Sequence, residues 1–117
     1  MNEAKLTKGE WSILPIEESK EYIRIRGTGL GGRYKVANVI DLKNHHDKSS
    51  WCKREREESK ANAHLIAAAP EMYAEIESEI ELLKEVRGDS HSEYLIALLD
   101  ERIANKQSLL AKARGES

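Results

Sequence analysis

The sequence predicts an α+β fold, in which an N-terminal antiparallel β-hairpin or small sheet is followed by three α-helices, the last two forming a helical hairpin. Three observations lead to this prediction. Polar and apolar residues alternate in two stretches before residue 42, and apolar residues recur every three or four positions after residue 50. The length of 117 residues fits one domain. We therefore expect a single domain over residues 1–117, with the sheet at 10–42 and the helical region at 51–113.

The composition limits how the chain can bind other molecules. Charged residues make up 34% of the chain, but the net charge is only −2, which argues against a whole-molecule electrostatic grip on nucleic acid or on a membrane. The hydrophobic fraction is 39% and Phe is absent, so the core is built mostly from aliphatic side chains. Such a thin core gains stability from oligomerisation, and we expect a homo-oligomer formed through the C-terminal helices.

The sequence also predicts a cytoplasmic location. No apolar run approaches the ~20 residues of a membrane helix, and residues 1–9 lack the apolar stretch of a signal peptide. The single cysteine, Cys52, cannot form an internal disulfide and suits a reducing compartment.

The predicted hairpin has one apolar face and one basic face. Its arms, residues 22–26 and 33–40, flank a loop at 27–32 that holds four glycines in six residues. If Arg26 pairs with Arg33, the core face contains Ile23, Ile25, Tyr34 and Val36. The opposite face then contains Tyr22, Arg24, Arg26, Arg33, Lys35 and Ala37.

Like charges placed side by side on this basic face cost free energy unless an anion lies between them. An external anion is one source of that negative charge, and backbone N–H groups of the glycine loop could help to bind it. The chain's own Glu17, Glu18 or Glu21, or an acidic helix, is the other source. The candidate ligand-binding residues are Arg24, Arg26, Gly29, Gly31, Arg33 and Lys35.

The helical region divides into three predicted helices. The first covers about residues 51–68, and Pro70 suits the first turn of the second, which ends near Gly88. The third covers about residues 90–113 and has a heptad seam that only Lys106 interrupts. The seam consists of Ile96, Leu99, Ile103, Leu110 and Ala113.

The helix after Pro70 is strongly acidic. It contains two series of glutamates at four-residue spacing. The first series is Glu71, Glu75 and Glu79, and the second is Glu77, Glu81 and Glu85. The glutamates of each series repel one another mildly. They form a solvated face, a docking surface for a basic partner, or a contact with the basic hairpin of a second subunit. Glu75 and Glu79 are the candidate partner-binding residues here.

No residue pattern predicts catalysis, a metal site or a cofactor. The glycine loop matches G-x-G-x-x-G, but a strand follows where a dinucleotide site needs a helix. His45 and His46, with nearby Asp41, Asp47 and Cys52, fit no established zinc spacing. No serine or cysteine lies in a nucleophile elbow. We therefore expect a protein that is not an enzyme, with no catalytic residues, no metal and no cofactor.

Two segments resemble a known family. Residues 5–11, Lys-Leu-Thr-Lys-Gly-Glu-Trp, resemble the Thr-Pro-Gly-Pro-Trp opening of small bacteriophage and prophage proteins. Residues 61–72, Ala-Asn-Ala-His-Leu-Ile-Ala-Ala-Ala-Pro-Glu-Met, resemble their Ala-Asn-Ala-Arg-Leu-Ile-Ala-Ala-Ala-Pro-Glu-Leu box, with His64 in place of Arg. The resemblance implies a phage accessory protein that acts in the host cell cytoplasm, a class in which inhibitors of host defence are common.

Three functions follow as hypotheses. The first is a counter-defence inhibitor that binds a host protein or nucleoprotein stoichiometrically through the acidic helical region. A second is a sponge that sequesters a small anionic nucleotide on the basic hairpin. The third is a nucleic-acid-binding regulator that uses the same hairpin, although the isoelectric point near 6.1 opposes it.

Overall fold

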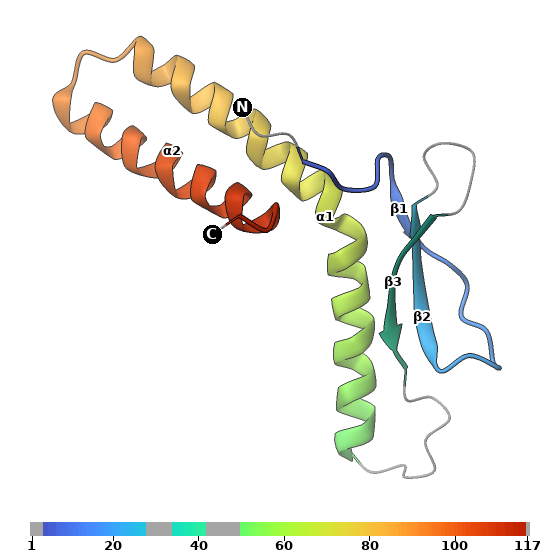
Figure 1. The fold of residues 1–117 in the computed structure, drawn as a ribbon. Helices are drawn as coiled ribbons and strands as arrows, with labels where there is room; N and C mark the ends of the chain where they lie inside the picture. The colour runs from blue at the N-terminus through green and yellow to red at the C-terminus, as the bar shows by residue number, and fades with distance from the viewer. Residues whose placement is uncertain (1–3, 28–33, 42–49, 117) are drawn as a thin grey trace. The chain divides into compact units, whose positions relative to one another are not determined.

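The computed structural model describes residues 4–27, 34–41 and 50–116. The chain forms a three-stranded antiparallel sheet followed by two helices, which confirms the predicted α+β class (Figure 1). The elements are β1 (Trp11–Ile13), β2 (Tyr22–Gly27), β3 (Tyr34–Ile40), α1 (Ser50–Gly88) and α2 (Glu93–Ala113).

The chain consists of two compact units that meet in the sequence at Pro70. The first is Leu6–Pro70, which holds the sheet and the first part of α1. The second contains Ala4, Lys5 and the chain from Glu71 onward, and thus the rest of α1 and all of α2.

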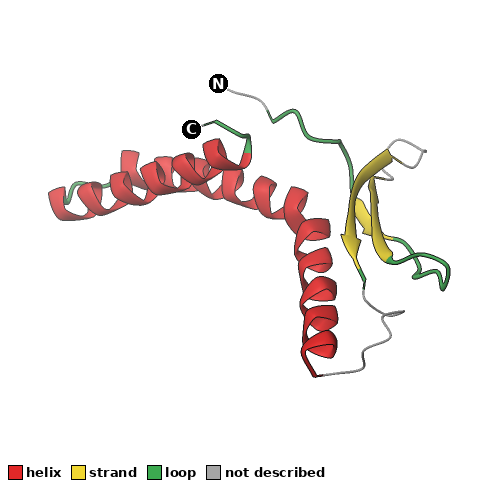
Figure 2. Cartoon of the chain, turned by 60° about the horizontal axis from the view of Figure 1, so that its bottom comes forward, coloured by secondary structure: helices red, strands yellow, loops and turns green. Residues whose placement is uncertain are grey.

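In the first unit, α1 packs on one face of the sheet (Figure 2). The central strand is β2, and its Ile23 and Ile25 are buried against Ala63 of α1. The alternation in β2 places these two isoleucines on the same face, as predicted. Partly buried apolar residues surround them: Trp11, Ile13, Val36, Ala37, Val39, Ile66 and Ala67.

The predicted register of the hairpin is wrong. Arg26 pairs with Lys35 instead of Arg33, and Arg24 pairs with Asn38 instead of Lys35. An irregularity between Ile25 and Arg26 shifts the register by one residue, so that Val36 and Ala37 both pack on the core.

The true register moves Ala37 to the core face of the sheet, whereas Tyr34 is exposed although it pairs with Gly27 on that face. Tyr34, which the predicted register placed in the core, is 48% exposed. Ala37, which it placed on the basic face, lies opposite Ile25 and packs on the core beside α1. A small residue at this position lets the helix approach the sheet closely, which a tyrosine would prevent.

The predicted break between the first two helices is also wrong, because α1 continues through Pro70. A proline inside a helix loses the hydrogen bond to the carbonyl four residues earlier, here that of Ile66. The loss is offset by packing on both sides of Pro70. Ala67 contacts the core of the first unit, and Tyr73 is buried in the core of the second.

In the second unit, α1 and α2 lie side by side as an antiparallel hairpin, as predicted for the last two helices (Figures 1 and 2). Its core contains Tyr73, Ile80, Ile103 and Leu110, with Ala4, Ile76 and Leu83 packed against them. The predicted seam of α2 therefore packs inside one chain, although its last member, Ala113, is exposed. The seam gives no reason for oligomerisation by itself.

The ends of α2 follow from its sequence. Ser92 is the N-cap, and its hydroxyl accepts a hydrogen bond from the N–H of Leu95 at 3.3 Å. At the other end, Gly115 has a φ of 81°, and its N–H donates to the carbonyl of Lys112. The N–H of Glu116 donates to the carbonyl of Ala111, which completes a Schellman motif.

Gly115→Ala should therefore destabilise the hairpin by about 1 kcal/mol, because an L side chain is strained at this positive φ. The matched control is Gly88→Ala at the end of α1, where an added Cβ meets no atom within 4 Å and φ is not positive. Alanine favours helix there, so the control should raise stability slightly. Thermal unfolding followed by circular dichroism compares the two, and a Gly115→Ala variant as stable as the control would contradict the prediction.

Candidate interaction surfaces

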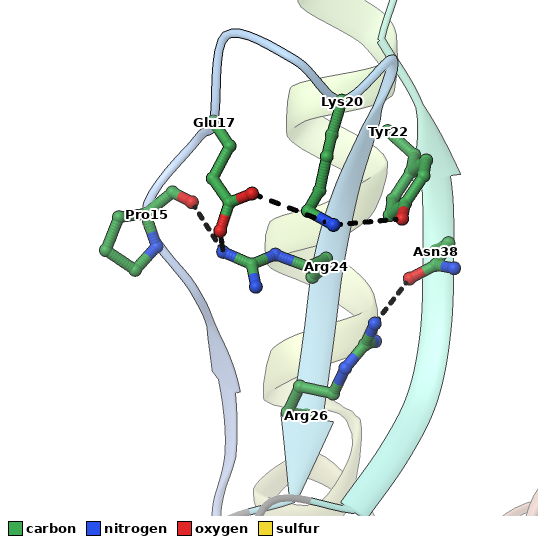
Figure 3. A network of polar contacts seen from close by, with 7 residues as sticks. All are labelled: Pro15, Glu17, Lys20, Tyr22, Arg24, Arg26 and Asn38. Carbon is green, nitrogen blue, oxygen red and sulfur yellow. Dashed lines mark hydrogen bonds and ion pairs between the residues drawn. The ribbon is translucent and has the colours of Figure 1, made fainter.

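A polar network lies on the face of the sheet turned away from α1 (Figure 3). The guanidinium of Arg24 forms an ion pair with Glu17 at 2.9 Å and donates to the carbonyl of Pro15 at 3.1 Å. Lys20 lies 3.7 Å from the same carboxylate and 5.6 Å from the ring centroid of Tyr22. One of the glutamates considered as an internal counter-charge, Glu17, thus contacts Arg24.

Arg26 is a structural part of the sheet. Only 7% exposed, it donates from Nη1 to the carbonyls of Ile25 and Ala37 at 2.9 and 3.0 Å. Its Nη2 donates to Oδ1 of Asn38 at 2.9 Å. These acceptors lie around the irregularity in the β2–β3 ladder, so the guanidinium bonds backbone and amide groups where the regular pairing shifts.

Of the other candidate residues on the hairpin, Lys35 is exposed and lies opposite Arg26. Gly29, Gly31 and Arg33 lie outside the described residues. The structure thus brings two cations, Arg26 and Lys35, together and gives the third, Arg24, an acidic partner of its own.

An ion pair between a buried carboxylate and a half-buried arginine links the end of the sheet to α1, and the sequence did not predict it. Asp41 is only 1% exposed, and its Oδ1 lies 2.7 Å from Nε of Arg56. Asp41 follows directly after β3, and Arg56 lies in the charged run at the start of α1. The sequence does show an acidic residue directly after a predicted strand. An acidic residue in a solvated loop looks the same, so this observation does not predict an ion pair.

The acidic part of α1 bears more negative charge than its neighbours compensate. Glu79, a candidate residue, pairs with Lys106 of α2 at 3.2 Å, and Glu81 lies 3.7 Å from Lys84. Within the described chain, no ion-pair partner faces the other four glutamates, which are exposed: Glu71, Glu75, Glu77 and Glu85. Lys106, which interrupts the predicted seam, thus neutralises one carboxylate only.

Near the tip of the hairpin, Arg87 of α1 forms an ion pair with Asp100 of α2. The guanidinium of Arg87 also donates a hydrogen bond to the carboxylate of Asp100. This hydrogen bond and the negative charge of Asp100 raise the pKa of Arg87 above its usual value. Arg87 thus compensates Asp100 of α2 instead of the glutamates of α1.

A groove of about 460 Å³ lies between α1 and α2 beside the second glutamate series. Its apolar floor is formed by Ile80 and Leu110. Both signs of charge are present around it, and its lining residues are Glu77, Ile80, Glu81, Lys84, Gln107, Leu110 and Arg114. Arg114 is held by the hydroxyl of Tyr73 and by Glu116, both at 2.8 Å. The groove can accept an apolar side chain flanked by charged groups.

The remaining sequence hypotheses concern metals and membranes. Among the residues that the structure describes, no three His, Cys, Asp or Glu side chains are placed to hold a metal ion. His45, His46 and the side chain of Cys52 lie outside that set. Neither helix, over its described residues, has a stretch apolar and long enough to cross a bilayer.

Comparison with known proteins places the whole chain in a phage family. Residues 1–117 match the family described as Salmonella phage P22 protein Y8K6. The chain belongs to this family. No curated protein and no solved structure matches it significantly. The predicted resemblance to phage proteins is confirmed at the level of this family, whereas the match does not test the two short sequence motifs individually.

This member of the P22 Y8K6 family offers two charged surfaces that differ in one respect. On the sheet, Arg24 and Arg26 bond acceptors of their own chain. On the helical hairpin, several carboxylates of α1 remain without a cation within the described residues. Among the described residues, the helical hairpin therefore has more uncompensated charged side chains than the sheet has.

Proposed function

We propose that this phage protein acts without catalysis, by binding a host protein or nucleoprotein stoichiometrically through the acidic surface of α1 beyond Pro70. The observation that supports it is the set of exposed glutamates without ion-pair partners in the described chain: Glu71, Glu75, Glu77 and Glu85. Glutamates four residues apart repel one another by roughly 0.2–0.5 kcal/mol per pair. A basic partner would convert this repulsion into attraction.

The proposed partner has a basic surface with a protruding apolar side chain. Its cations would face Glu77 and Glu85, while the apolar side chain would enter the groove over Ile80 and Leu110. Complementary charge accelerates encounter and fixes orientation, and a desolvated apolar anchor provides much of the affinity. Because the P22 Y8K6 family is a phage family, we propose that the partner belongs to a host defence pathway and that binding blocks it.

Charge reversal tests this proposal. Glu77→Lys with Glu85→Lys should weaken capture of the host partner at least tenfold, because both substitutions add positive charge opposite a basic surface. Capture from host lysate at increasing salt, followed by titration of the identified partner, measures affinity and stoichiometry. The unaltered protein should saturate at a fixed molar ratio, and expression in a host with the defence should restore plating of a sensitive phage.

The matched control is Glu57→Lys with Glu58→Lys, which makes the same charge change at exposed positions of α1 in the first unit. The control should bind as the unaltered protein does. Equal binding by both double variants, or turnover of a substrate in place of saturation, would refute the proposal.

A second candidate function rests on the pairing of Arg26 with Lys35. Arg26 bonds carbonyl and amide oxygens, and among the described residues no carboxylate forms an ion pair with Arg26 or Lys35, so two positive charges lie opposite each other on the sheet. A small anionic nucleotide could bind beside Lys35, and the protein would then act as a sponge. Mass spectrometry of small molecules released from the purified protein distinguishes the two functions, because only the sponge retains a stoichiometric nucleotide.

A further inference from the structure

An apolar strip runs along one side of the helical hairpin, next to its core. We call it the apolar flank, and its residues are Met72, Leu82 and Val86 of α1 and Leu95, Leu98 and Leu109 of α2. Five of the six are exposed large hydrophobic side chains, between 39% for Leu95 and 57% for Leu82, and Leu98 is partly buried. Exposed apolar side chains scattered singly need no explanation, whereas several of them on one side of a helical hairpin point to an interaction site.

The geometry of an antiparallel helix pair places these residues on one side. Met72 and Leu82 directly precede the core positions Tyr73 and Leu83, and Leu109 directly precedes Leu110. Residues that precede core positions lie on the same side of both helices when the helices run antiparallel. The ion pair between Glu79 and Lys106 lies on this side as well, because Glu79 precedes Ile80. Both helices therefore contribute apolar side chains to one side of the hairpin, where the charged Glu75, Glu79 and Arg102 lie among them.

The charges along the flank differ between the two helices. Between Glu71 and Gly88, α1 has six glutamates against Lys84 and Arg87. Over Glu93–Ala113, α2 has three acidic and three basic residues, and Arg102 lies in line with Leu98 and Leu109 on the flank. Within the described chain no acidic side chain pairs with Arg102. A hollow of about 290 Å³ on α2 surrounds it, lined by Leu98, Glu101, Arg102, Asn105 and Lys106.

We propose that the apolar flank is the dimer interface of this protein, with α1 of one copy lying along α2 of a second copy. This arrangement places the acidic helix of each copy on the neutral helix of the other and brings Arg102 close to the glutamates of the partner's α1. The alternative, α1 on α1, would bring two strongly acidic helices together and is disfavoured. A two-fold dimer of this kind uses the same surface on both copies.

The interface is separate from the groove proposed to bind a host protein. Glu77 and Glu81 of the groove lie on the other side of the hairpin, since they follow the core positions Ile76 and Ile80. The dimer would therefore present two copies of the groove. Dimerisation can be tested independently of any host partner.

Sedimentation velocity of the purified full chain provides the test. The unaltered protein should sediment as a dimer at micromolar concentration, and Leu82→Lys with Leu109→Lys should sediment as a monomer with unchanged helical circular dichroism. Both leucines are more than half exposed, so their replacement leaves the core of the hairpin intact. Leu65→Lys is the control, because Leu65 is 59% exposed on α1 but lies in the first unit. It should remain a dimer.

Arg102→Glu tests the arrangement of the helices. It should raise the dissociation constant of the dimer at least tenfold, because it adds an acid opposite the acidic α1, and Arg102→Gln should raise it less. A monomeric unaltered protein would overturn the proposal, as would a dimer that persists in the Leu82 and Leu109 variant. A dimer that Arg102→Glu strengthens would show that α2 does not face α1 of the partner. If the monomeric Leu82 and Leu109 variant no longer captures a host protein, the flank binds that protein instead of a second copy.

Discussion

Arg56→Met should lower the free energy of unfolding of the first unit by about 2 kcal/mol, because it removes a charge-assisted hydrogen bond from a buried carboxylate. Asp41 is 1% exposed, and Arg56 provides a guanidinium at 2.7 Å. Methionine keeps most of the length of the side chain, so the decrease in stability comes from the missing charge and its hydrogen bond. Denaturant unfolding followed by tryptophan fluorescence measures it, because both tryptophans, Trp11 and Trp51, belong to this unit.

A double-mutant cycle isolates the pair. Asp41→Asn with Arg56→Met should be less destabilised than Arg56→Met alone, because the buried side chain is then neutral. The control is Arg54→Met, an exposed arginine of the same charged run, which should change stability little. If Arg56→Met behaves like Arg54→Met, the contact between Asp41 and Arg56 contributes nothing to the link between α1 and the sheet.

Ile25→Ala should destabilise the same unit by about 3 kcal/mol, within the range found when a buried isoleucine is truncated to alanine. Ile25 is fully buried on the central strand, where it packs in the cluster that contains Ile23 and Ala63. Truncation leaves a cavity between the sheet and α1, and the small core offers few side chains to fill it. The tryptophan signal should therefore report a lower midpoint of unfolding.

Ile40→Ala is the matched control for this change. It removes the same atoms from the neighbouring strand, but Ile40 is 63% exposed and should tolerate the loss within about 0.5 kcal/mol. Equal effects at the two isoleucines would mean that the face assignment of the sheet is wrong. The far-ultraviolet circular dichroism of the second unit should persist if the two units unfold separately.

Local sequence patterns are sufficient to place the strands of the hairpin and the last helix. Alternation over residues 22–26 places Ile23 and Ile25 on one face of a strand whatever its partner, because successive side chains point to opposite faces. The helix over residues 93–113 follows from its apolar spacing, which predicted a helix over about residues 90–113. These are local properties, so neighbouring residues suffice to predict them.

The register between β2 and β3 depends on contacts that exist only in the folded chain. Val36, Ala37 and Val39 are all apolar, so either register gives β3 an apolar face. In the folded chain Ala37 packs on the cluster that contains Ala63 of α1. The helix continues through Pro70 because cores on both sides of it offset the lost hydrogen bond. That energy depends on contacts far apart in the sequence, and no local pattern reports it.

The same division applies to the candidate surfaces. The sequence placed Glu75 and Glu79 together on an acidic helix, but only the packing of α2 distinguishes them, because it brings Lys106 to Glu79 and leaves Glu75 without an ion pair among the described residues. Likewise, Arg24 and Arg26 were predicted to be equivalent members of a basic face. Folding brings Glu17 to Arg24 and places Arg26 among carbonyl and amide oxygens, since the backbone path around the sheet sets which acceptor each side chain reaches.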